Sequence, residues 1–153
     1  MEPVKNEKAI DSVHSGSLDF ASAAFARAVG KLAAVCWRPS GLPPAQAGLL
    51  LHIFNEYYSF PKFISSELLV NPSVITRLAD KLIAKGLLFR MAGGNCTLLV
   101  PTRKAEELLP TLMQCIKDFD DRCFELLGFE AARSLAASLN SCTDKIAAYL
   151  AKP

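Results

Sequence analysis

The sequence is poor in the residues that carry out catalysis or hold metals. Its 153 residues include only two histidines and one tryptophan, and it has no glycine-rich phosphate-binding loop. The five cysteines are odd in number and none stands in a CxxC pair, which argues against a disulfide framework and against a zinc site. No apolar run reaches the roughly 18–20 residues that a membrane-spanning helix needs. We therefore expect neither an enzyme nor a membrane protein, and no cofactor.

The remaining candidates for chemistry are isolated. His52 lies in a mostly apolar stretch and is expected to be packed, and the adjacent acids Asp120 and Asp121 point in different directions if they lie on a helix. The opening segment 1–8 is charged and has no apolar stretch behind it, so it does not resemble a secretory signal. We expect a cytoplasmic protein whose cysteines are reduced and mostly buried, because a free thiol packs as a small apolar group.

The charge of the chain is small in total but unevenly distributed. The formal net charge is +2. Between Lys62 and Lys104 seven residues are basic and two are acidic, so this segment carries +5 and the rest of the chain carries −3. A basic middle between acidic flanks is the pattern expected of a site for a polyanion such as nucleic acid.

Apolar residues recur at helical spacing through most of the chain, which predicts a mostly α-helical fold. Asn71 and Pro72 form a typical helix start, and Gly86 and Gly128 have the positions of glycines that end helices. Six helices are expected, at about 17–37, 43–58, 62–69, 72–85, 103–127 and 130–150.

The one segment with the pattern of β-structure lies between the fourth and fifth expected helices. Two apolar runs flank the turn segment 92–95 and predict a small β-hairpin; the runs are 87–91 and 96–100. A short helix, a tight turn, a longer capped helix and then a hairpin define a winged helix-turn-helix. We place this unit at 42–102, within a single domain over 17–153 that follows a flexible arm at 1–16.

The helices outside the winged unit, at 17–38 and 103–150, carry apolar stripes of their own. The small winged unit can largely close its own core, so we expect the surplus apolar surface to pair with a second copy of the chain. A two-fold dimer doubles the number of bases that are read and requires a palindromic site. A larger core within a monomer is the alternative.

Three stretches of the sequence resemble the MarR family of transcription regulators. Leu42–Leu50 resembles the opening of the family's second helix, with Gln46 in place, and Ile64–Leu78 resembles its helix-turn-helix. Asp80–Arg90 resembles the stretch that leads into the wing and is the most specific of the three. The resemblance covers about 17–150. It implies a dimeric regulator that binds double-stranded DNA and is often controlled by a small aromatic or phenolic compound or, in some members, by oxidants.

The sequence departs from the family pattern at two places. The family's wing normally holds an acidic residue followed by an arginine that enters the minor groove, whereas segment 92–95 is uncharged and Arg90 is the only basic residue near it. Leu69 stands where the family often has a glycine, so a looser or differently shaped turn is expected there. The competing interpretation is a winged-helix module that has weak or no DNA binding and acts through protein contacts.

The helix that begins at Pro72 is the expected DNA reader, because an α-helix fits the major groove and its first turns reach the base edges. Short or forked polar side chains suit that place, and Arg77 can pair with guanine through two hydrogen bonds. Lysines 81 and 85 and the wing arginine are expected on phosphates, which position the protein without reading the sequence. The predicted DNA contacts are Ser73, Val74, Thr76, Arg77, Lys81, Arg90 and Asn95. The alternative is that the hydroxyls cap the helix and the lysines form a solvated face.

A regulatory pocket is expected between the DNA-binding unit and the dimerisation helices. Aromatic residues gather at the ends of the first two helices, with a histidine nearby; the candidates are Trp37, His52, Tyr57, Tyr58 and Phe60. Apolar walls with a few polar tips suit a flat aromatic acid or phenol, whose carboxylate Lys31 or Arg38 would meet. The alternatives are that these aromatic residues are simply core, or that the protein senses oxidants through Cys36, which has Arg38 nearby.

Overall fold

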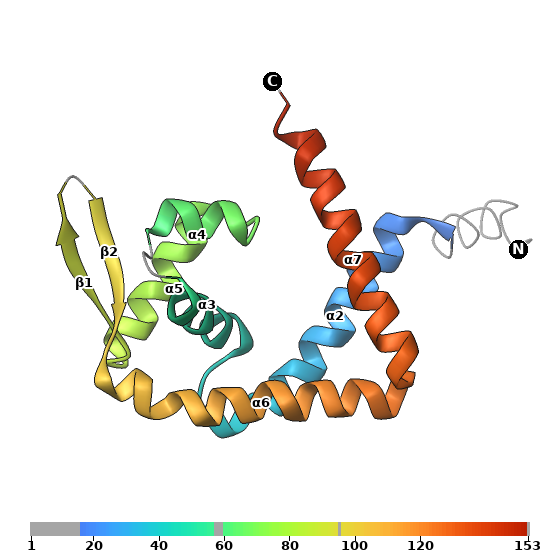
Figure 1. Cartoon of the computed structure of the whole chain (residues 1–153), viewed down its shortest axis with the longest axis horizontal. Coiled ribbons are helices and arrows are strands. Elements are labelled where there is room, and N and C mark those ends of the chain that lie inside the picture. Colours follow the sequence, from blue (N-terminus) through green and yellow to red (C-terminus); the bar gives the residue numbers. More distant parts are fainter. Residues whose placement is uncertain (1–15, 57–59, 95, 153) are drawn as a thin grey trace, which may run out of the picture.

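The computed structural model describes residues 16–56, 60–94 and 96–152. Helices make up most of it, with one two-stranded antiparallel sheet among the described residues, as the sequence predicted. The elements are α2 (Leu18–Cys36), the short 3-10 helix η1 (Arg38–Ser40), α3 (Pro44–Asn55), α4 (Pro61–Glu67), α5 (Pro72–Ala84), β1 (Leu88–Gly93), β2 (Cys96–Pro101), α6 (Arg103–Leu127) and α7 (Phe129–Leu150). Figure 1 shows α6 as a long rod that joins α3–α5 and the hairpin at one end to α7 at the other.

Local sequence signals placed most helix ends correctly. The carboxamide oxygen of Asn71 accepts a hydrogen bond from the backbone N–H of Ser73 at 3.0 Å, so Asn71 caps α5 as expected. Helix α6 spans the predicted residues and ends before Gly128. The expected end of α3 near residue 58 is wrong, because α3 stops at Asn55 and Glu56 is extended. Apolar spacing continues past that point, and spacing alone does not show where the backbone leaves the helix.

The hairpin turn is tighter than the sequence predicted. Residues 92 and 93 were expected in the turn, but Ala92 pairs with Thr97 and Gly93 pairs with Cys96 in the ladder. The loop is therefore two residues long, and Gly94 has a φ of +66°. Two-residue hairpin loops match the twist of the strands and need positive φ values, which glycine adopts without steric cost.

The hydrophobic core lies within the winged unit and the adjoining half of α6. Its buried side chains come from α3, α4, α5, the bases of both strands and α6; the largest include Leu49, Leu50, Ile64, Ile75, Leu82, Leu88 and Leu112. By contrast, none of the residues of α2 and α7 is buried, and both helices lie wholly in the described part of the chain. The winged unit thus forms its core together with the first half of α6. No described helix is long and apolar enough to cross a membrane.

Candidate nucleic-acid interface

Helix α5 presents one polar stripe to solvent and one apolar stripe to the core. Ile75, Ala79 and Leu82 are at most 1% exposed, and they repeat at the three- and four-residue spacing of a helix face. The predicted DNA-contacting residues Ser73, Thr76, Arg77 and Lys81 are all exposed, and Asp80 shares their stripe. Val74 is only half exposed. The structure therefore brings the predicted reading residues together on one accessible face, beginning at the capped end of the helix.

Two of these side chains form hydrogen bonds to their own helix. The hydroxyl of Thr76 donates to the carbonyl of Pro72 at 3.1 Å, and Nε of Arg77 donates to the carbonyl of Ser73 at 3.4 Å. Both bonds are exposed to solvent, and the net contribution of such a hydrogen bond is only about 0.5–1.5 kcal/mol. The guanidinium of Arg77 keeps its other N–H donors, so the side chain can turn outward at small cost.

Arg90 of the wing is paired with a residue of helix α5. Its Nη2 lies 2.6 Å from Oδ1 of Asp80, and both side chains are about half exposed. Arg90 was predicted to contact a phosphate, and Asp80 is one of the two acids of the basic segment; their pairing was not predicted. Spacing along the chain cannot show the pair, because it joins a helix to a strand ten residues later. The pair orients the guanidinium through one of its five N–H donors and leaves the other four available.

The wing itself is apolar rather than charged. Phe89 is 44% exposed and Met91 is 46% exposed, although both lie in β1. Asn95, the predicted contact at the tip, lies outside the described residues. Arg90 is therefore the one predicted wing contact whose position the structure describes, and its neighbours on the strand are large apolar side chains.

The turn between α4 and α5 keeps the backbone shape that glycine usually supplies. Leu69 has a φ of +52°. Its N–H donates to the carbonyl of Ser66, and the N–H of Val70 donates to the carbonyl of Ser65, which is the Schellman pattern of a left-handed helix end. The same pattern ends α5, with Gly86 at the corresponding place. The expectation of a looser turn at Leu69 is therefore wrong, and the leucine adopts a conformation that side chains with a Cβ disfavour.

A polar joint fastens the end of α5 to the start of α6. The hydroxyl of Thr102 donates to the carbonyl of Gly86 at 2.7 Å and accepts from the N–H of Ala105 at 3.3 Å, so it also caps α6. The ammonium of Lys104 donates to the carbonyl of Lys85 at 2.7 Å. Lys85, expected on a phosphate, instead donates through its ammonium to the carbonyl of Gly41 at 3.2 Å. No local sequence signal predicts this joint, because its partners are distant in the chain.

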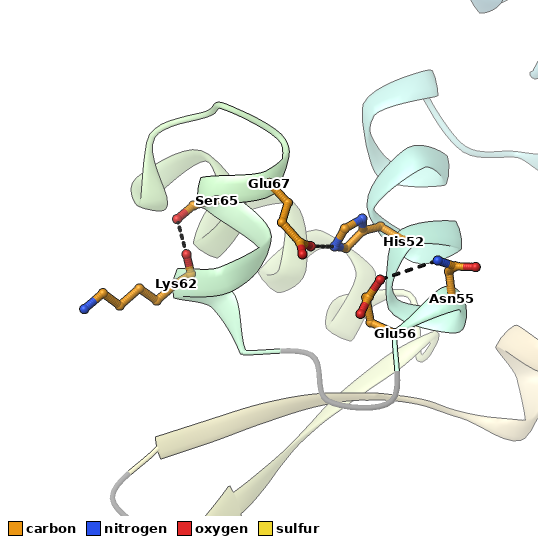
Figure 2. A network of polar contacts seen from close by, with 6 residues as sticks. All are labelled: His52, Asn55, Glu56, Lys62, Ser65 and Glu67. Carbon is orange, nitrogen blue, oxygen red and sulfur yellow. Dashed lines mark hydrogen bonds and ion pairs between the residues drawn. The ribbon is translucent and has the colours of Figure 1, made fainter. Parts of the chain in front are cut away.

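The aromatic group predicted to form a ligand pocket is only partly described. Tyr57 and Tyr58 lie outside the described residues, Trp37 packs against the core, and the ring of Phe60 lies 6.0 Å from that of Phe63. His52 on α3 faces the end of α4, where its Nε2 lies 2.9 Å from Oε2 of Glu67 (Figure 2). These atoms are within ion-pair distance but do not form a hydrogen bond. The expected pocket stays a prediction.

The expectation that the cysteines are mostly buried is wrong for the four whose side chains the structure describes. Cys115 is buried, Cys36 and Cys123 are half-buried, and Cys142 is exposed. Burial raises the pKa of the Cys123 thiol, and the carboxylate of Asp120 and the nearby thiol of Cys36 raise it further. A raised pKa makes a thiol a poorer nucleophile at neutral pH.

Large apolar side chains are exposed along the helices outside the winged unit. On α2 they include Leu18 at 73% and Val35 at 53%, and on α7 they include Ile146 at 54% and Leu150 at 73%. An apolar groove of about 340 Å³ runs between α2, α6 and α7, with Phe25, Phe119 and Leu139 among its lining residues. Contiguous apolar surface of this kind marks an interaction site.

No family model matches the sequence, and no curated protein sequence matches it. Solved structures do match. CouR from Rhodococcus jostii RHA1 bound to p-coumaroyl-CoA has a TM-score of 0.72 at 18% identity, over 88% of this chain and 94% of that chain. CouR bound to a 23-mer DNA duplex has a TM-score of 0.73 at 23% identity, over 95% of this chain and 99% of that chain. A MarR transcriptional regulator from Methanosarcina mazei Go1 has a TM-score of 0.70 at 18% identity, over 84% of this chain and 90% of that chain. The chain has the winged-helix fold of the MarR-family transcription regulators.

Proposed function

We propose that this chain belongs to the MarR family and is a DNA-binding transcription regulator of the cytoplasm. The observation that carries the proposal is the exposed polar stripe of α5, which begins at its capped N-terminus and lies beside a wing. CouR, which shares this fold, was solved bound to a DNA duplex. A fold alone does not establish function, so the side chains of the stripe must supply the DNA contacts.

In the proposed complex, α5 enters the major groove with its first turns against the base edges. Arg77 leaves the carbonyl of Ser73 and pairs with a guanine, while Ser73 and Thr76 offer short donors and acceptors. The half-exposed side chain of Val74 suits contact with a thymine methyl group. Lys81 and Arg90 bind phosphates, and Asn95 is the proposed contact at the wing tip. Because the tip carries no charge, the affinity depends mainly on the helix.

The regulator acts as a homodimer on a palindromic site. The winged unit and the first half of α6 form one core, whereas α2 and α7 bury none of their described residues. The exposed apolar side chains of α2 and α7 need a partner surface. A second copy related by a two-fold axis supplies the same surface in a self-complementary contact. It also places two copies of α5 on one face, so that two half-sites are read together.

A small aromatic or phenolic effector releases the DNA in this proposal. CouR was solved bound to p-coumaroyl-CoA. In this chain the proposed site involves Trp37, His52 and Phe60, together with Tyr57 and Tyr58. The effector shifts the equilibrium only by binding one spacing of the two α5 helices more tightly than another.

A second function is favoured by the wing. Its exposed Phe89 and Met91 are unusual for a surface that faces phosphates, and Phe63 on α4 is 65% exposed. A winged-helix module that binds another protein through these side chains would use apolar contact in place of charge. This alternative predicts little DNA affinity and a weak dependence on salt.

Selection of bound fragments from random or genomic DNA tests both functions. We expect a symmetric consensus of two half-sites, with an affinity that falls steeply as salt rises because phosphate contacts release counterions. Enrichment of no sequence, combined with a flat salt dependence, would overturn the DNA-binding proposal in favour of the interaction module. A consensus without symmetry would overturn the dimer alone.

A further inference from the structure

The two faces of the wing hairpin differ in what they contact. Successive side chains of a strand point to opposite faces. Leu88 and Arg90 share one face of β1, where Leu88 is buried in the core and Arg90 pairs with Asp80 of α5. That face is therefore turned toward the winged unit. Phe89 and Met91 share the other face of β1, which is turned away from it.

The outward face of the hairpin is apolar across both strands. In the antiparallel register, Phe89 lies opposite Val100. Met91 lies opposite Leu98 in the same way, and residues directly opposite each other share a face. We call these four side chains the outer wing face; those of β1 are exposed and those of β2 are half-buried. Arg90 is the only charged residue in the sequences of β1 and β2 and lies on the other face, so the outer wing face carries no charge.

The outer wing face is too small to hold a free partner by itself. Phe89 is 44% exposed, which is about 90 Å² of a side chain that offers about 200 Å². On the same scale the whole face exposes on the order of 300 Å². A contact that covers this area on both partners buries roughly 600 Å², whereas specific stable interfaces bury about 1,200–2,000 Å². A partner must therefore be brought to the face by another interaction.

The position of the wing in the chain indicates which partner that is. Proteins contact the DNA backbone mainly through cations and hydrogen-bond donors, and the four side chains of the outer wing face provide neither. Figure 1 shows the hairpin at one end of α6 and α7 at the other. When two copies pair through α2 and α7, their wings therefore lie at the outer ends of the dimer. A second dimer bound at a neighbouring site on the same DNA presents its own wing to the first.

We propose that the outer wing face binds the same face of a second dimer at an adjacent DNA site. A two-fold axis between the dimers places Phe89 and Met91 of one copy against the same face of the other, and no like charges meet. Neighbouring sites on one DNA raise the effective concentration of the two faces to about the millimolar range. A contact too small to join free dimers therefore forms on DNA and makes binding to paired sites cooperative. This inference rests on the proposed function, because DNA holds the two dimers together.

Binding to DNA that carries two copies of the selected site tests the contact. The spacing between the centres of the two sites is varied in single base pairs, because the two wings meet only when both dimers lie on the same side of the duplex. At the favourable spacing we expect the second site to bind about tenfold or more tightly than a single site does. A further half helical turn, about 5 base pairs, turns the second dimer to the opposite side and should abolish this cooperativity.

Three variants separate the contact between wings from the binding of DNA. The F89S/M91S variant makes the outer wing face polar; it should lose the cooperativity and bind a single site as the original chain does. The F89L/M91L variant keeps the face apolar and should keep the cooperativity. The F63S variant removes an exposed aromatic side chain of α4, outside the face, and should also keep it.

Three results would overturn the contact between wings. The first is no cooperativity at any spacing, a measurement on the original chain that needs no variant to fold. The second is cooperativity that F89S/M91S retains. The third is a single-site affinity that F89S/M91S lowers, because the outer wing face would then contact DNA.

Sedimentation equilibrium without DNA makes the failure of this contact distinguishable from the failure of the proposed function. At about 1 mM chain, near the effective concentration on DNA, we expect weak association of dimers that F89S/M91S lacks. If the chain selects no DNA and yet associates in this way, the DNA-binding function alone is refuted. If the chain selects DNA and no such association occurs, the contact between wings alone is refuted.

Discussion

Replacing Thr102 with valine should destabilise the chain by about 2 kcal/mol, because one hydroxyl serves both sides of the joint between α5 and α6. The hydroxyl accepts from the N–H of Ala105 at 3.3 Å as the cap of α6 and donates to the carbonyl of Gly86 at 2.7 Å. Loss of a helix cap costs about 1 kcal/mol, and loss of a hydrogen bond costs another 0.5–1.5 kcal/mol, roughly. Valine has nearly the shape of threonine, so no cavity adds to these two losses.

Urea denaturation at a fixed protein concentration measures the effect. With a slope of about 1–3 kcal/mol per M of urea, a loss of this size should lower the midpoint by roughly 1 M. The matched control is Thr102→Ser, which keeps the hydroxyl and should stay within about 0.5 kcal/mol of the original chain. Equal midpoints for the valine and serine variants would show that the hydroxyl does not hold the joint. A large loss in both would point to the methyl group instead.

Four further predictions follow from particular contacts. Arg77→Ala should weaken binding to the selected operator by about 1–3 kcal/mol per half-site and leave the melting temperature unchanged. The control Arg122→Ala on α6 should alter neither quantity. A mobility-shift titration in which Arg77→Ala binds as tightly as the original chain contradicts the assignment of Arg77 to a base contact. Gly86→Ala should lower the free energy of unfolding, measured by thermal denaturation, by about 1 kcal/mol, because φ is +72° at this position. The nearest side-chain atom to an added Cβ is 3.9 Å away, so the loss comes from the backbone conformation and not from a clash. An unchanged stability would argue against the left-handed helix end. Leu139→Glu, in the apolar groove beside α7, should yield a folded monomer by sedimentation at micromolar concentration, where the original chain sediments as a dimer; a monomeric original chain refutes the dimer. Iodoacetamide should alkylate Cys123 more slowly than free cysteine at pH 7.5, because the raised pKa of the Cys123 thiol leaves little thiolate near neutrality. The rate should keep rising as the pH increases. A fast rate at pH 7.5 that no longer changes with pH would contradict the raised pKa.

The contrast between Leu69 and Gly86 shows where local sequence information stops. Gly86 was identified as a helix end because glycine adopts positive φ without cost, and the structure agrees. Leu69 lacks that signal and yet adopts the same hydrogen-bonding pattern, with a φ of +52°. A positive φ at leucine has a conformational cost of the order of 1–2 kcal/mol. The packing of α4 and α5 on the core must offset that cost. Intrinsic preference at one residue cannot predict an outcome that neighbouring helices impose.

The sequence by itself determined the elements and the faces of the helices in this protein. Asn71 caps α5 through a bond to a residue two positions later, and the polar residues Ser73, Thr76 and Arg77 of its first turns were assigned to an accessible face. Such signals depend on neighbours within one helical turn, so they can be identified from the sequence. Only the tertiary structure decided that Arg90 pairs with Asp80, that Lys85 serves the joint rather than the polar stripe, and that the apolar faces of α2 and α7 stay uncovered. These outcomes depend on how distant segments pack, and packing is a property of the assembled fold.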